Sequence, residues 1–136
     1  MTLDFFMAMH PPTVTAQEHQ VTVRNGKPVF YDPPELKAAK AKLISHLGKH
    51  APGHKMTGPI ELLTKWCFLA GNHEHGEYRI TKPDTDNLQK LLKDCMTTCG
   101  FWEDDAQVCR EITEKFWSDL PGIYIRITEL SGEEDG

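Results

Sequence analysis

The sequence predicts an α+β protein with a mixed β-sheet and two main helices, at about residues 33–50 and 86–99. Three observations lead to this expectation. Two segments repeat apolar residues at helical spacing, several others are β-prone or alternate apolar and polar residues, and turn signals separate them. A chain of 136 residues can also bury one hydrophobic core without disulfides. We therefore expect a single domain over residues 1–130 and a disordered acidic tail at 131–136.

The N-terminal part predicts a strand, a hairpin and the first helix. The run from Leu3 to Met9 is β-prone and is ended by two prolines. Two further β-prone runs flank Asn25-Gly26, the strongest short signal for a hairpin. Asp32 then opens a helix as a candidate N-cap, with prolines in the first turn. The apolar stripe of this helix consists of Leu36, Ala39, Leu43 and Leu47.

The second helix has the clearest periodicity in the chain. Asp86 with Gln89 resembles a capping box at its start, and Gly100 supplies the stop. Apolar residues recur at i, i+3, i+4, i+7, i+8 and i+11, which places them on one face: Leu88, Leu91, Leu92, Cys95, Met96 and Cys99. A metal shared by Cys95 and Cys99 is the alternative to this core position, and the apolar face favours the core.

Strand patterns lie on both sides of this helix. We expect a long strand at 59–70, a short one at 77–82 that ends at Asp84, and a further strand at 106–117. A last strand alternates isoleucines with polar residues, which predicts one buried face: Ile123, Ile125 and Ile127. The two histidines at 73–75 lie on the turn between strands, where they have no fixed geometry, so zinc is disfavoured.

Composition and charge limit the classes of partner. No apolar run reaches the roughly 18 to 20 residues of a membrane helix, and the N-terminus lacks a basic signal region, so we expect a cytoplasmic protein. The net charge of −5 argues mildly against nucleic acid as a partner. Residues 33–66, however, carry a local balance of +4. The lysines of the first helix are therefore either a solvated face or phosphate contacts.

Five aspartates lie within 22 residues: Asp84, Asp86, Asp94, Asp104 and Asp105. Like charges at this density repel one another, and a bound cation is the usual compensation. Carboxylate oxygens suit Mg²⁺ or Mn²⁺. Asp84 and Asp86 can converge where strand turns into helix, whereas the return of Asp104 and Asp105 to that point depends on strand pairing. Lys90 shares a helix face with Asp86, so it either stabilises charge on a phosphate or forms an ordinary salt bridge.

Two segments, DTDNLQK at 84–90 and GFWEDDAQV at 100–108, resemble the signature of the RusA family of Holliday junction resolvases. The resemblance implies a homodimer that binds four-way or branched DNA and cuts two opposed strands with Mg²⁺, or Mn²⁺ as a substitute. It also implies a bacterial or phage-infected bacterial cell. The implied catalytic residues are Asp84, Asp86, Lys90 and Asp105; the implied metal ligands are Asp84, Asp86, Asp105 and Asp104.

Other site residues follow less directly from the same resemblance. Asn87 and Gln107 match the signature and are expected to support the site. The expected DNA contacts are Arg79 and Lys82, just before the first catalytic aspartate, with Lys37 and Lys40 on the first helix. The sequence thus predicts a metal-dependent endodeoxyribonuclease that resolves Holliday junctions. A nuclease for flaps or forks, and an inactive junction-binding protein, remain the alternatives.

Overall fold

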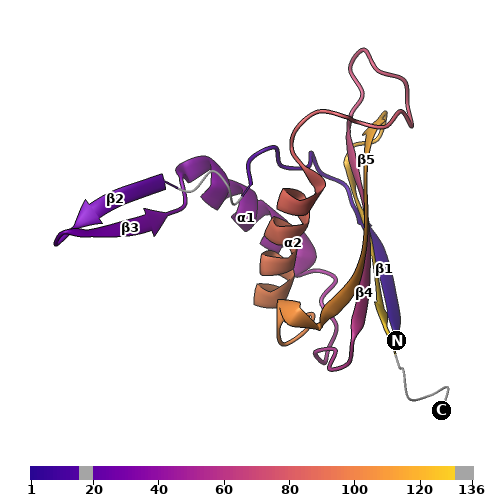
Figure 1. Ribbon diagram of the computed structural model, residues 1–136. Helices are drawn as coiled ribbons and strands as arrows, with labels where there is room; N and C mark the ends of the chain where they lie inside the picture. Colours follow the sequence, from indigo (N-terminus) through magenta and orange to yellow (C-terminus); the bar gives the residue numbers. More distant parts are fainter. Residues whose placement is uncertain (16–19, 131–136) are drawn as a thin grey trace.

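The predicted α+β class is confirmed by a computed structural model that describes residues 1–15 and 20–130. A four-stranded mixed sheet in the order β1-β6-β4-β5 carries two helices on one face (Figure 1). The expected tail at 131–136 lies outside the described residues. The strands are β1 (Thr2–Met7), β6 (Gly122–Glu129), β4 (Ile60–Leu69) and β5 (Val108–Ser118). The helices are α1 (Pro34–Leu47) and α2 (Thr85–Cys99), and none of the described helices is long and apolar enough to cross a membrane.

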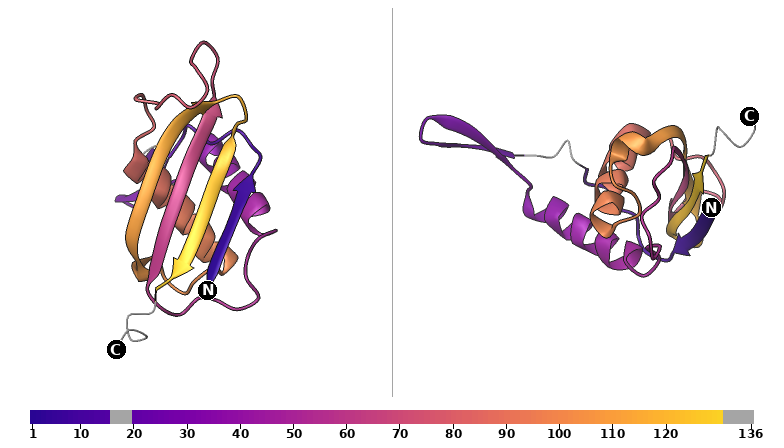
Figure 2. Two further views of the ribbon diagram at one scale, coloured as in Figure 1. Left: turned by 90° about the vertical axis from the view of Figure 1, so that its right-hand side faces the viewer. Right: turned by 90° about the horizontal axis from the view of Figure 1, so that it is seen from below.

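The core lies between the sheet and the helices, as the sequence periodicity predicts. The predicted stripe of α1 is buried in full, and so are Ile123, Ile125 and Ile127 of β6. Residues of β4 alternate between buried and more exposed positions, because neighbouring side chains point to opposite faces of a sheet. The opposite face of the sheet carries no helix (Figure 2). The packing of α2 on the sheet determines which of its polar residues reach the surface.

One connection makes the sheet mixed. β4 and β5 run parallel, whereas β1 and β4 pair with β6 in antiparallel register. Parallel neighbours need a crossover, and here the crossover is α2. As a result, α2 begins near the end of β5 at Lys115 and ends near its start, where the 3₁₀ turn η2 (Asp105–Gln107) precedes β5.

The hairpin formed by β2 (Gln20–Arg24) and β3 (Lys27–Tyr31) confirms the Asn-Gly signal. Asn25 and Gly26 have φ angles of 53° and 75°, so both residues of the turn are left-handed. This geometry matches the twist of a two-residue hairpin. The hairpin stands away from the sheet and helices (Figures 1 and 2).

Three local expectations are wrong. Asp32 does not cap α1, because Pro33 is the N-cap and Asp32 instead binds Lys40 at 2.8 Å. The segment 77–82 is not a strand, because it meets β5 only through the Tyr78–Phe116 bridge and neighbouring bonds. The N-cap of α2 is Asp84 rather than Asp86, and it makes no side-chain cap hydrogen bond within the described chain. The capping box of this region belongs to η2 instead.

Gly122 is required at the start of β6 by close packing. A Cβ atom at this position would lie 2.1 Å from Cζ of Phe6 and 2.6 Å from the carbonyl oxygen of Met7. The ring could move, but the Met7 oxygen belongs to the paired strand β1. The position therefore excludes every side chain for steric reasons.

We predict that Gly122→Ala destabilises the protein by about 1–3 kcal/mol, the usual cost of overpacking. Urea denaturation measures this change. Gly53→Ala is the matched control, because its Cβ meets nothing within 4 Å among the described residues. Equal stability of the two variants would show that β1 can shift away from β6.

Candidate active site on helix α2

The first turn of α2 presents two carboxylates. Asp84 is the N-cap and Asp86 lies in the first turn, and both are exposed. The positive end of the helix dipole favours negative charge here. Since the Asp84 side chain does not cap the helix, the first backbone N–H groups of α2 receive no side-chain oxygen from it. This end of the helix therefore combines acidic side chains with backbone donors.

Lys115 fixes the segment that leads into Asp84. Its ammonium group donates to the carbonyl oxygens of Thr81 and Pro83, each at 2.7 Å. Burial lowers the pKa of Lys115 and repulsion from Arg79 adds to this effect, whereas Asp84 acts in the opposite direction. The position of Asp84 thus depends on a lysine from β5 that sequence reasoning did not identify.

Of the four residues expected to contact DNA, Arg79 and Lys40 are partly exposed and have partners within the chain. The Arg79 guanidinium lies 4.2 Å from the ring centre of Phe68 and 4.6 Å from that of Trp117, and burial lowers its pKa. It also donates to the carbonyl oxygen of Lys82. Lys40 binds Asp32. Lys37 and Lys82 are exposed.

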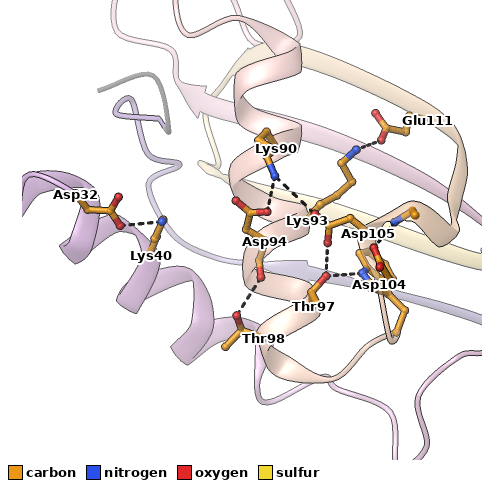
Figure 3. Close-up of polar contacts among 12 residues, drawn as sticks. Asp32, Lys40, Lys90, Lys93, Asp94, Thr97, Thr98, Asp104, Asp105 and Glu111 are labelled. Atoms are coloured by element: carbon orange, nitrogen blue, oxygen red, sulfur yellow. Dashed lines mark hydrogen bonds and ion pairs between the residues drawn. The ribbon is translucent and has the colours of Figure 1, made fainter. Parts of the chain in front are cut away.

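Further along α2, three of its polar residues meet Asp105 of η2; we call Lys90, Asp94, Thr97 and Asp105 the Asp105 cluster (Figure 3). Lys90 Nζ lies 2.9 Å from Asp94 and 3.9 Å from Asp105. Trp102 Nε1 donates to the Thr97 hydroxyl at 2.7 Å, and this hydroxyl donates to Asp105. Lys90 therefore forms an i, i+4 salt bridge, but its partner is Asp94, one turn further along the helix, and not Asp86.

The environment of Asp105 keeps its carboxyl group ionised. Burial acts to raise its pKa, but the hydrogen bond from the Thr97 hydroxyl, the neighbouring Trp102 N–H and the charge of Lys90 lower it overall. The hydrogen bond to Asp94 raises the pKa of Lys90. The cluster is consequently a charged network at neutral pH.

Two other signature residues build the turn before β5. Asp104 caps η2 by accepting from the Ala106 N–H at 2.9 Å, and Gln107 Oε1 accepts from the backbone of Glu103 and Asp104. Gln107 Nε2 donates to the carbonyl oxygens of Met56 and Gly58. These bonds hold Asp105 in place, which agrees with a supporting role for Gln107.

The predicted convergence of carboxylates is not found within one chain. Among the described residues, no three His, Cys, Asp or Glu side chains form a group that could hold a metal ion. Asp86 is separated from Thr97, the partner of Asp105, by roughly 16 Å of helix at about 1.5 Å per residue. Strand pairing is the reason, since parallel β5 begins at the far end of α2. Mg²⁺ nevertheless needs only one or two carboxylates with water and phosphate, so Asp84 and Asp86 fit its chemistry.

A depression between α2 and β5 adjoins the first turn of α2. Its volume is about 290 Å³, and its lining residues are Thr85, Asp86, Gln89, Glu111 and Thr113. Sequence reasoning considered Gln89 only as part of a helix cap, but the structure buries it. Its helical spacing to Leu92 and Met96, which places a polar residue on an apolar stripe, is the signal that could have identified it.

Comparisons with known proteins extend over nearly the whole fold. A family profile described as "Endodeoxyribonuclease RusA" matches residues 10–128. The uncharacterized protein YqaN of Bacillus subtilis (strain 168) is 31% identical over 122 residues, which cover 81% of this chain and 85% of that protein. A protein of Lactococcus phage r1t named crossover junction endodeoxyribonuclease rusA is 26% identical over 133 residues, covering 96% of this chain and 100% of that protein.

We predict that Thr97→Val raises the pKa of Asp105 and destabilises the protein. The buried Trp102 N–H loses its acceptor, which costs about 1–3 kcal/mol. Because the folded-state pKa of Asp105 is lowered, its stabilising contribution exists above the unfolded value near 3.9 and is lost as the pH falls through the folded pKa. The difference in unfolding free energy between the wild type and Thr97→Val should therefore become smaller at acid pH.

Urea denaturation between pH 2 and 7 and carboxyl NMR titration measure these two effects. Thr98→Val is the matched control, because the exposed Thr98 hydroxyl donates to the carbonyl oxygen of Asp94 in the same helix and, among the described residues, has no contact with Asp105. An unchanged pKa of Asp105 in Thr97→Val would contradict the proposed network.

Proposed function

The chain belongs to the RusA endodeoxyribonuclease family, and from this premise we propose that it resolves Holliday junctions by cutting two opposed strands of a four-way DNA. One observation carries the proposal to this chain's own residues: Asp84, Asp86 and Lys90 occupy the exposed start of α2, where a DNA backbone can approach. The name of the phage relative, which spans this chain almost completely, supports the same substrate.

We propose that Asp84 and Asp86 bind Mg²⁺, with Mn²⁺ as a substitute. Their hard oxygen donors suit this ion, and water and the substrate phosphate are the remaining ligands it commonly takes. When bound, the ion would supply a water of lowered pKa and would polarise the phosphate that is cut. Asp104 is the exception among the expected ligands, because it is committed to capping η2.

Lys90 and Asp105 act together in this proposal. Lys90 remains cationic because Asp94 raises its pKa, and it lies one turn from Asp86 on the same helix face. Its ammonium group offsets the negative charge that develops on the phosphate. Asp94 and Asp105 fix the position of this ammonium group on the surface of α2. Asn87 is half-buried in the first turn of α2 and is assigned a supporting role in this proposal.

We propose a homodimer as the active form. Two copies related by a two-fold axis present two equivalent sites to a junction with the same symmetry, which accounts for paired cuts. Within one chain Asp105 pairs with Lys90 and accepts from Thr97, so its role in this proposal is to position Lys90. Direct DNA contacts are assigned to Lys37 and Lys82, which are exposed, whereas Arg79 and Lys40 are held by Phe68 and Asp32 within the chain.

We predict that Asp86→Asn slows cleavage of a synthetic four-way junction by at least about 100-fold and leaves junction affinity within a few-fold, because binding relies mainly on other groups. Cleavage in Mg²⁺ and gel shifts without it measure the two quantities. Asp119→Asn, an exposed carboxylate beyond the end of β5, is the matched control. Equal loss of binding and cleavage would contradict separate roles.

The same assay separates the alternative functions. Flap, fork and duplex substrates are included with the four-way junction. Faster cutting of flaps or forks would identify a different branched substrate. Tight junction binding by a wild-type protein that cuts none of them would indicate an inactive junction-binding protein.

We predict that Mg²⁺ raises the melting temperature of the protein and that Asp84→Asn/Asp86→Asn removes this effect. A ligand that binds only the folded state at 100 times its dissociation constant stabilises by about 2.7 kcal/mol. Thermal melting over a series of Mg²⁺ concentrations measures the change, with Ca²⁺ as a second hard cation. An equal increase in the double variant would place the ion elsewhere.

A further inference from the structure

Gln89 is a buried polar residue on the side of α2 that faces the sheet. Its side chain is 2% exposed, and it lines the depression between α2 and β5 together with Asp86 and Glu111. Its side-chain nitrogen Nε2 has no hydrogen-bond partner among the residues that the structure describes. An unpaired buried donor lowers stability, so its retention beside a depression suggests a ligand.

Hydrogen-bond donors and acceptors fix the orientation of this amide. Trp66 Nε1 can only donate, and it donates to the Thr64 hydroxyl at 2.9 Å. The Thr64 hydroxyl still has its own proton to donate, and it donates to Gln89 Oε1 at 2.8 Å. A flipped amide would place an N–H₂ group against this hydroxyl and remove the acceptor of the Thr64 proton. The two N–H bonds of Nε2 are thus left without a partner by the geometry of β4.

The missing partner is an oxygen acceptor of small size. Thr85 and Asp86 of the first turn of α2 line the same depression, and the positive end of the helix dipole favours negative charge there. Two lysines offset acidic side chains here, because Lys93 binds Glu111 and Lys115 lies beside Asp84. An oxyanion that approaches with its own counter-ions therefore meets donors and a negative charge that is partly offset.

We propose that Gln89 Nε2 donates a hydrogen bond to a nonbridging oxygen of a DNA phosphate that enters this depression. The proposal rests on the proposed function, because it takes the ligand to be the DNA backbone, and it adds a substrate-contacting residue to those that the family resemblance implies. Thr64 and Trp66 act as positioning residues for this amide.

The depression has room for the contact. Its volume of about 290 Å³ compares with about 30 Å³ for one water molecule, so it admits a phosphate group with solvent. Because Nε2 is buried in the free chain, the contact requires a local rearrangement of the depression when DNA binds.

The test compares Gln89→Met, which lacks both donor and acceptor, with Gln89→Glu, which keeps an acceptor for Thr64. We expect both variants to cut a four-way junction at least about 10-fold more slowly in single-turnover assays, since each lacks the donor. Ile127→Val is the control for loss of stability, because it trims the core on β6, two strands from β5. Melting temperatures show that each variant is folded.

Substituting the phosphate identifies the contact. A junction in which a methyl group replaces one nonbridging oxygen at the scissile phosphate should be cut more slowly by the wild type. The same substitution should have a smaller relative effect on Gln89→Met, which has no donor to lose. Full additivity of the two changes, or cleavage by both Gln89 variants at the wild-type rate, would overturn the proposal and leave Gln89 a purely structural residue.

A second measurement keeps the proposal separate from nuclease activity. The side-chain N–H₂ of Gln89 gives its own ¹⁵N NMR signal, assigned by its absence in Gln89→Met. Junction DNA added with Ca²⁺ should shift this signal. A wild-type protein that binds but does not cut would refute the proposed function while a shift would still support the contact; an unshifted signal in saturated complex would overturn the contact alone.

Discussion

The crossover that carries the chain from β4 through α2 to β5 is the constraint on which the candidate site depends. Parallel strands begin at the same end of the sheet. The helix between β4 and β5 must therefore run the length of the strands, from the end of β4 back to the start of β5. Its first turn then lies beside Lys115 and its last turns lie beside Asp105. The acidic residues of the signature are therefore distributed along the whole helix rather than gathered at one end.

Each end of α2 is held by side chains that have no catalytic part in the proposal. At the start, Lys115 and Arg79 bind the backbone of the segment that leads to Asp84. At the end, Gln107 ties the turn around Asp105 to the backbone at Met56 and Gly58. Exposed carboxylates can be positioned accurately only if the backbone beneath them is fixed, and these bonds provide that support.

Most of the fold could be predicted from periodicity, because burial of one face is a local property of each element. The stripe of α1, the alternation of β4 and the Asn-Gly hairpin are found as expected. Two of the errors concern side chains that had several possible hydrogen-bond partners in the sequence. Asp32 binds Lys40 instead of capping α1, and the box expected at Asp86 and Gln89 is found at Asp104 and Gln107.

The sequence by itself determined the α+β class, the helix that carries Asp86 and Lys90, and the resemblance to a nuclease family that the comparisons confirmed. These follow from residue identity and spacing within single elements. Only the tertiary structure decided that Asp105 joins Lys90 and Asp94 rather than Asp84, that Arg79 is stacked on aromatic rings, and that Gln89 has a donor without a partner. Each of these depends on which strand pairs beside which, and strand pairing between distant segments is not encoded in local spacing.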